Sequence, residues 1–318
     1  MLSNIGAFFS IWLILWLILS VVFVLLYPLL RPSLFRLHPR YSSALVLCYW
    51  LTPLLGSLTS ALFLFTPIVE VFLVDSHCHV ACESHAPQIG SKGLAWFGVT
   101  VGLCVLVYLM IRLTSIVTSA YRLNGQFSRL ANFRGDYFSI SSLNPLVFTL
   151  GWWNPKIFIS DGLVSSCSEE DLSIVIMHEE GHKLRRDNLR LLLARLSTAL
   201  LTEPLARKVI ADIQLLTEQA CDFYAAEKYG HIAVAETLLK VKRLLMEDSK
   251  LSLQGATAFA DNSVEQRILV LISDEQKLAL RPWQLAVLVT LGLSLLFASI
   301  GPLHHGSEWV IAFLTAGH

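Results

Sequence analysis

The sequence predicts an α-helical membrane protein with four transmembrane helices and an α+β domain inserted between the third and the fourth. Three observations support this fold class. The chain of 318 residues is 54% hydrophobic and only 15% charged, whereas a soluble domain carries about a quarter charged residues. Four stretches are apolar over the roughly 20 residues that a helix needs to cross a bilayer. Between the last two lie about 160 residues of mixed composition, enough for one compact domain.

The predicted spans cover residues 5–30, a part of 44–74, 94–117 and 283–300. The second stretch is longer than one span requires, and Pro53, Gly56 and Pro67 predict a kink or a break. The first stretch has no basic residue before its apolar run and no small-residue cleavage site after it. We therefore interpret it as a membrane anchor and not as a signal peptide.

Arginines predict the orientation of the chain in the bilayer. Three follow the first span and four lie at or after the end of the third, whereas the link after the second span has one lysine against two acidic residues. Because cytoplasmic loops are enriched in Lys and Arg, the amino terminus should lie outside. The chain then divides into residues 1–118 with three spans and an outer loop at 75–92, a cytoplasmic domain at 119–281, and a fourth span with a short outer tail at 282–318.

The predicted cytoplasmic domain begins with strands and continues with helices. Residues 135–160 are rich in Phe, Ile, Val and Trp and are interrupted by Asn-Pro pairs, which predicts two or three short strands. Ser168 and Asp171 have the spacing of a capping box, so a helix should begin there and run to about Leu201. Pro204 predicts a break, and two further helices are expected over 207–229 and 232–247.

The stretch IVIMHEEGHKLRRDN, residues 174–188, places His178 and His182 four residues apart, with Glu179 directly after the first. Residues i and i+4 of a helix lie on one face, so both imidazoles can bind one metal ion. A catalytic zinc ion takes three protein ligands and keeps a fourth position open. Glu179 is placed to act as the general base toward attacking water. The motif predicts a catalytic Zn2+ ion, with a charged turn on a solvated helix as the alternative.

A third zinc ligand is expected from the later segment TEQACD, where Glu218 and Asp222 are again four residues apart. We predict Glu218 as this ligand, with a surface carboxylate as the alternative. Asp222 lies one helical turn further on. It is expected to accept the free ring N–H of a ligating histidine and so to fix its orientation, although a solvated carboxylate would have the same spacing.

HEEGHKLRRDN followed by EQACD, set between a third and a fourth predicted span, resembles the BlaR/MecR family of bacterial membrane metallopeptidases. The stretches GWWNPKIFISDGL and SVEQRILVLI resemble the segments that precede this family's zinc helix and its last span. The more distant HtpX and CAAX-prenyl protease family shares the HExxH and ExxxD patterns. The resemblance extends over most of the chain in architecture, but its specific motifs occupy a few dozen residues.

The resemblance implies a zincin-like metallopeptidase domain of the gluzincin type on the cytoplasmic face of the bacterial inner membrane. It assigns His178, His182 and Glu218 as zinc ligands and Glu179 as the catalytic base, in agreement with the residues themselves. It also implies a protein substrate, often a transcriptional repressor, that is cleaved in signal transduction. Arg267 matches an arginine of the family pattern. The sequence leaves open whether it binds substrate or supports the domain.

The predicted outer loop is a second candidate metal site. In the antibiotic sensors of the family a penicillin-binding domain follows the fourth span, whereas here GPLHHGSEWVIAFLTAGH follows. We therefore expect a signal to enter elsewhere. The loop segment HCHVACESH carries ligands that suit zinc or copper: His77, Cys78, His79, Cys82 and His85. We predict that this loop binds a soft metal ion. The alternatives are a Cys78–Cys82 disulfide and a polar loop without metal.

Two further functions fit the same residues. One is a quality-control protease for membrane proteins, and the other is a receptor with an inactive zinc domain, although such a domain would not need Glu179. The formal net charge of zero gives no indication of direct nucleic acid binding. The expected partners are the lipid bilayer and a protein substrate. For the substrate, the strand near Lys156–Ser160 is a candidate edge for peptide pairing, with a core strand as the alternative.

Overall fold

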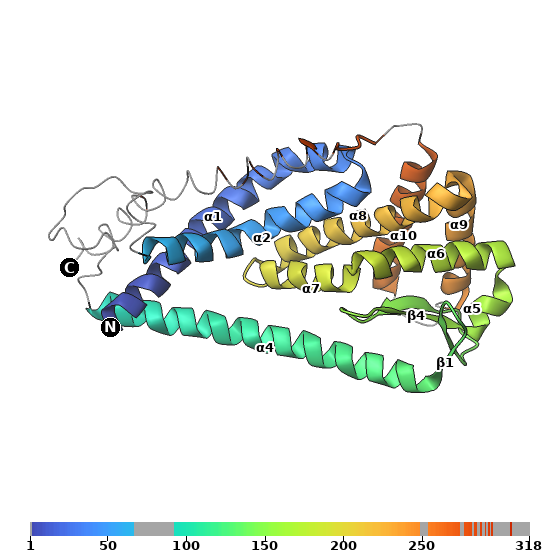
Figure 1. The fold of residues 1–318 in the computed structure, drawn as a ribbon, viewed down its shortest axis with the longest axis horizontal. Coiled ribbons are helices and arrows are strands. Elements are labelled where there is room, and N and C mark those ends of the chain that lie inside the picture. Colours follow the sequence, from blue (N-terminus) through green and yellow to red (C-terminus); the bar gives the residue numbers. More distant parts are fainter. Residues whose placement is uncertain are drawn as a thin grey trace. The chain divides into compact units, whose positions relative to one another are not determined.

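The computed structural model describes residues 2–66, 92–248, 254–273 and 277–281, together with isolated residues between 283 and 306. The chain divides into two compact units. The first unit comprises Met1–Ser33, Cys48–Ile111 and Leu280–His318, and the second comprises Leu34–Leu47 and Arg112–Ala279. The elements are mostly helical, with one small sheet (Figure 1).

Three described helices are long and apolar enough to cross a membrane, and they coincide with the first three predicted spans. They are α1 (Leu2–Arg36), α2 (Pro39–Leu64) and α4 (Lys92–Leu130). The proline-containing second stretch forms one helix through Pro53 as far as Leu64. The predicted fourth span at 283–300 lies almost entirely outside the described residues, as do the histidines and cysteines of the predicted outer loop.

The first unit is held together by close helix packing. Its buried cluster joins Ala7, Ile11, Trp12 and Leu15 of α1 to Ala61 and Leu64 of α2. Helices α1 and α4 also approach each other closely. A Cβ atom built on Gly98 would overlap with the Ser10 hydroxyl. Small residues at such crossings let helix backbones approach, which is how helices associate where lipid replaces water.

The second unit contains a four-stranded sheet in the order β1-β2-β4-β3. Its strands are β1 (Ala131–Phe133), β2 (Phe138–Ile140), β3 (Val147–Leu150) and β4 (Lys156–Ser160). The last three lie in the segment where strands were predicted. β4 pairs parallel with β2 and antiparallel with β3. Because both of its edges are taken, β4 is a core strand, and the expectation that a substrate could pair with it is wrong.

Within the described part of the second unit, six helices follow the sheet: α5 (Asp161–Ser166), α6 (Glu169–Arg185), α7 (Asp187–Ser197), α8 (Glu203–Tyr229), α9 (His231–Asp248) and α10 (Gln254–Ile272). Figure 1 shows α6 between the sheet and α8, and it contacts β3 and β4 on one side and α8 and α9 on the other. The apolar core on the sheet side includes Ile157, Ile159, Leu163 and Val175. Helix α6, which carries the HExxH motif, is therefore the central element of this unit.

The predicted capping box is present, but the predicted length of its helix is wrong. Ser168 is the N-cap of α6, and its hydroxyl accepts a hydrogen bond from the backbone N–H of Asp171. The helix ends at Arg185 and not near Leu201. Arg186 adopts a left-handed conformation with φ 53° and ψ 47°, which a non-glycine residue rarely adopts. The chain turns there, and α7 begins at Asp187.

Asp171 also ties α9 to the first turn of α6. Its carboxylate accepts hydrogen bonds from the Thr237 hydroxyl at 2.9 Å, from the Lys240 ammonium at 3.0 Å and from the Ser168 hydroxyl at 2.6 Å. Burial alone would raise the pKa of Asp171, but these hydrogen bonds outweigh it and leave the pKa lowered. The ionised carboxylate therefore stabilises the fold.

Replacing Asp171 with Asn should lower the free energy of unfolding at neutral pH by about 1–2 kcal/mol, since Lys240 is half-exposed and its charge is screened. Because the folded-state pKa is lowered, this contribution is complete above the ordinary aspartate pKa of about 4 and is lost as the pH falls through the folded-state value. Thermal unfolding of the detergent-solubilised protein from pH 7 to pH 3 measures it. Glu169→Gln, which removes an exposed charge from the same helical turn, is the control. A deficit equal for both variants, or independent of pH, would contradict the prediction.

Candidate metal centre

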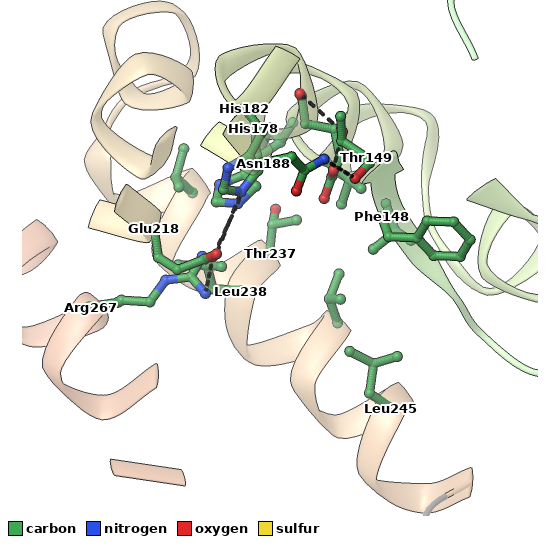
Figure 2. A pocket seen from close by; sticks show the side chains of 16 residues that line it. Phe148, Thr149, His178, His182, Asn188, Glu218, Thr237, Leu238, Leu245 and Arg267 are labelled. Carbon is green, nitrogen blue, oxygen red and sulfur yellow. Dashed lines mark hydrogen bonds and ion pairs between the residues drawn. The ribbon is translucent and has the colours of Figure 1, made fainter. Parts of the chain in front are cut away.

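The two histidines of the motif direct the same ring nitrogen toward one point. His178 and His182 lie one turn apart on α6, and their Nε2 atoms are 3.2 Å apart. Glu218 on α8 completes the group, with Oε2 3.5 Å from His178 Nε2 and Oε1 3.5 Å from His182 Nε2. Figure 2 shows the two imidazoles and the Glu218 carboxylate facing one another. The structure thus brings together the three residues predicted as zinc ligands.

These distances match the dimensions of a tetrahedral zinc site. Zinc binds imidazole nitrogen and carboxylate oxygen at about 2.0–2.2 Å, so neighbouring ligand atoms of a tetrahedron lie about 3.3–3.6 Å apart. The three separations here are 3.2, 3.5 and 3.5 Å. Two ring nitrogens this close, both facing a carboxylate, also require a proton or a cation between them. The donor set therefore fits Zn2+ in both geometry and charge.

Glu179 is the second carboxylate at this point, and a hydrogen bond holds it in place. One ligand atom each from His178, Glu179 and His182 lies within 4.8 Å of the others. Glu179 is buried, and its Oε2 accepts a hydrogen bond of 2.6 Å from the hydroxyl of Thr149 on β3. Each Glu218 oxygen lies 3.5 Å from one of the two Nε2 atoms, so Glu218 is placed as the third ligand. Glu179 then lies beside the predicted metal position as the candidate base.

Buried charges surround the ligands on α8 and α10. Asp222 is completely buried, and its Oδ1 lies 3.0 Å from His178 Nδ1, out of line for a linear N–H···O bond. Arg267 on α10 donates to both oxygens of Asp222, at 2.8 and 2.7 Å. Its third nitrogen lies 3.0 Å from Glu218 Oε2. Arg267 therefore supports the domain at the predicted metal centre, and it also lines the adjoining cavity.

His182 is oriented by a residue that sequence reasoning did not single out. Its Nδ1 lies 2.9 Å from Oδ2 of the buried Asp187. An N–H donated from Nδ1 to a carboxylate leaves Nε2 free to bind a metal ion. Asp187 is the first residue of α7, and the left-handed turn at Arg186 is what brings it back to His182. The motif HEEGHKLRRDN contained Asp187, but a continuous helix would have carried it away from His182.

The electrostatics of the centre favour a cation. Burial would lower the pKa of His178, but the carboxylates of Asp222 and Glu218 outweigh burial and raise it to about 10. Burial would likewise raise the pKa values of Glu218 and Asp222, yet the Arg267 guanidinium keeps both below their usual range. A site that holds a proton this firmly offers the same negative field to a metal ion, which would displace that proton on binding.

The three predicted ligands, His178, His182 and Glu218, line a cavity of about 370 Å³ (Figure 2). Its polar end holds His178, Glu179, His182, Asn188, Glu218 and Arg267, and its apolar wall includes Val147 and Phe148 of β3 and Leu238, Val241 and Leu245 of α9. Asn188 donates a hydrogen bond of 2.8 Å to the backbone carbonyl of Thr149, which ties β3 to the start of α7. The cavity is large enough for part of a peptide, since ligand pockets begin at about 300 Å³.

Gly181 allows α6 and α8 to approach at this point. A Cβ atom built on Gly181 would lie 3.2 Å from the Cys221 sulfur and 3.3 Å from the Cys221 Cα atom. Cys221 itself is completely buried, three residues after the ligand Glu218. A glycine inside a helix costs about 1 kcal/mol relative to alanine. Here that cost is offset by the close contact that places Glu218 opposite the histidines.

Comparison with known families supports a metallopeptidase. Residues 141–249 match the model of peptidase family M48. This range contains β3, β4 and α5–α9 and therefore the HExxH motif and Glu218, whereas Arg267 lies beyond it. No curated protein and no solved structure matches the chain. The match supports a zinc metallopeptidase of the M48 type, and the specific resemblance to BlaR/MecR stays a prediction.

Gly181→Ala should push α8 away by a few tenths of an ångström and weaken zinc binding by about tenfold. The control is Gly125→Ala, because a Cβ atom at Gly125 meets nothing within 4 Å. That change should leave zinc binding intact and stabilise the helix by up to about 1 kcal/mol. Zinc affinity is measured by competition with a chromophoric chelator. Equal affinities for the two variants would contradict a role for Gly181 in placing Glu218.

Proposed function

We propose that this protein is an integral-membrane zinc-dependent endopeptidase. The observation that carries the proposal is the convergence of two Nε2 atoms and the Glu218 carboxylate at 3.2–3.5 Å, with Glu179 beside them. The match to a peptidase family over the same residues supports it independently. Three helices that are long and apolar enough to cross a membrane support the membrane assignment.

The residues of the site divide the chemistry of peptide hydrolysis among them. His178, His182 and Glu218 would hold the zinc ion, which when bound polarises the substrate carbonyl and activates water. Glu179 accepts a proton from the attacking water and passes it to the nitrogen of the leaving amine. The Thr149 hydroxyl donates a hydrogen bond of 2.6 Å to Glu179 Oε2, and Glu179 lines the cavity. Arg267, Asp222 and Asp187 hold the ligands in position.

Strand β3 is the edge to which a peptide substrate would bind. Within the described residues, β3 is the last strand of the sheet order and pairs with β4 alone. Its residues Val147, Phe148 and Thr149 line the cavity. An extended peptide can add to such an edge through backbone hydrogen bonds, with side-chain pockets providing specificity. The apolar wall from α9 favours a substrate with an apolar side chain next to the scissile bond.

Glu179→Gln should retain zinc and lose peptidase activity by about 10²–10⁴-fold, because the amide cannot accept the proton from water. His178→Ala should lose both zinc and activity. Elemental analysis of the detergent-purified protein gives the zinc content, and cleavage of a quenched-fluorescent peptide mixture gives the activity. Full biological output of Glu179→Gln in cells, despite lost peptide cleavage, would favour the alternative of a receptor whose zinc domain is inactive. Failure of wild type to bind zinc after reconstitution would reject the zinc site.

Thr149→Val should reduce kcat by about tenfold with unchanged zinc content, since the base loses its fixed orientation. Thr149→Ser keeps the hydroxyl and should restore most of the rate. The readout that separates orientation from folding is the rescue of kcat by Thr149→Ser at equal zinc content and equal thermal stability of the two variants. Equal kcat values for the valine and serine variants would rule out this role of Thr149.

The cellular role that we propose is signal transduction through cleavage of a protein substrate, such as a transcriptional repressor. The support is the sequence resemblance to bacterial membrane signal transducers, together with the arginines that predict a cytoplasmic domain and an outer amino terminus at the bacterial inner membrane. The predicted outer metal loop would provide an entry for the signal. Membrane-protein quality control is the alternative use of the same site.

Substrate breadth separates these two roles. A signalling peptidase should cut one or a few cellular proteins, and its cleavage should depend on an external signal such as a soft metal ion. Comparison of new protein termini in cells that express wild type or Glu179→Gln measures this breadth. Cleavage of many unrelated membrane proteins, without dependence on added copper or zinc, would favour quality control.

A further inference from the structure

The side chain of Arg185 connects the metal centre to the helix α2. Arg185 is the last residue of α6, and only 14% of its side chain is exposed. Its Nε donates to both oxygens of Asp187, at 3.2 and 3.3 Å. One terminal nitrogen donates a hydrogen bond of 2.6 Å to the hydroxyl of Ser43, which lies 142 residues earlier in the chain. A single guanidinium thus joins two distant segments.

Asp187 receives Arg185 on one side and His182 on the other. The oxygen that lies 2.9 Å from His182 Nδ1 is also 3.3 Å from Arg185 Nε. The buried Cys221 thiol lies 3.6 Å from the same oxygen. A second cation, Arg190, lies 3.9 Å from the other oxygen, Oδ1. A carboxylate with these cations and donors around it has little freedom to rotate, so its hydrogen bond to His182 has a set direction. Without Arg185, Asp187 would keep its place in the chain but lose the contact that holds its oxygens toward His182.

Ser43 is itself held firmly inside the second unit, which includes Leu34–Leu47. Its side chain is 2% exposed. The segment before it, residues 34–42, packs against α8 through the ring of His38, whose centroid is 4.9 Å from that of Phe223. It also exchanges backbone hydrogen bonds with Leu278, from His38 N–H at 3.0 Å and to the Arg36 carbonyl at 3.2 Å. The hydroxyl that meets Arg185 is therefore presented by a docked segment and not by a free loop.

We propose that Arg185 is a positioning residue for the zinc ligand His182, and that Ser43 on α2 holds Arg185 for this task. The path runs from Ser43 Oγ through the Arg185 guanidinium and the Asp187 carboxylate to His182 Nδ1. Through this path, the start of α2 becomes a part of the metal centre, although it lies far from the HExxH motif in sequence. The inference rests on the proposed function, since it assigns His182 as a zinc ligand.

Zinc affinity of the full-length protein in detergent micelles tests the path without recourse to peptide cleavage. Ser43→Ala, which removes a single oxygen atom, should weaken zinc binding about threefold to tenfold. Arg185→Met should weaken it by about 10–100-fold, the range found when a group that orients a metal ligand is lost. Because both act along one path, Ser43→Ala/Arg185→Met should bind no more weakly than Arg185→Met alone. Cobalt in place of zinc gives a second readout, since its visible spectrum reports a changed ligand geometry.

Matched controls separate positioning from folding. Ser173→Ala removes an exposed hydroxyl that bonds only to the Glu169 carbonyl within α6, and Arg195→Met removes an exposed arginine of α7. Both should bind zinc as wild type does. Arg185→Lys keeps the charge but cannot reach Asp187 and Ser43 with a rigid fork, so it should be as weak as Arg185→Met within about threefold. Thermal unfolding of the metal-free variants verifies that each one is folded.

The outcomes distinguish this proposal from the proposed function. Wild-type zinc affinity and an unchanged cobalt spectrum in folded Ser43→Ala would overturn the path, even if the wild-type protein is an active peptidase. Fully additive losses in the double variant would overturn it as well. A wild-type protein that binds zinc without cleaving peptides would reject the peptidase and leave the path to be decided by the affinities. Non-additive losses with an altered cobalt spectrum would establish it.

Discussion

The second unit depends on one constraint, which is that the three side chains predicted to bind a metal must be held together among buried charges. Each of them has its own charged support. Asp187 faces His182, Asp222 faces His178, and Arg267 contacts Glu218 and Asp222 together. Buried charges are tolerated only where they are paired and hydrogen-bonded. The helices α6, α7, α8 and α10 are therefore constrained by the same few ion pairs that prepare the metal centre.

Two backbone features of α6 help to satisfy this constraint. The left-handed Arg186 ends α6 and returns Asp187 to His182, although a non-glycine residue in that conformation carries a strain of about 1–2 kcal/mol. Gly181 lowers the stability of the helix, but because it has no side chain it lets Cys221, and with it α8, lie close to α6. Both features are unfavourable in isolation. They persist because the ion pairs and the packing of α6 between the sheet and α8 over-determine the geometry.

Helix α6 also connects the cavity to α2, one of the three described helices that are long and apolar enough to cross a membrane. Its first turn is tied to α9 through Asp171, Glu179 in its middle lines the cavity, and its last residue donates to Ser43 of α2. Coupling between two sites requires an element that both sites touch. The Ser43–Arg185 hydrogen bond is a contact of this kind.

Local features of this protein, such as helix starts, helix faces and apolar spans, could be predicted from the sequence. Helical spacing put His178 and His182 on one face, the Ser168–Asp171 pair marked where α6 begins, and long apolar runs identified three helices that suit a membrane. Tertiary structure decided what lies between distant segments. It set the end of α6 at Arg186 and the edge position of β3. It also made the contacts between residues far apart in the chain, which are the hydrogen bond from Thr149 to Glu179, that from Arg185 to Ser43 and those of Arg267. No periodicity or spacing encodes such contacts, because they depend on how separate elements pack and not on the residues next to them.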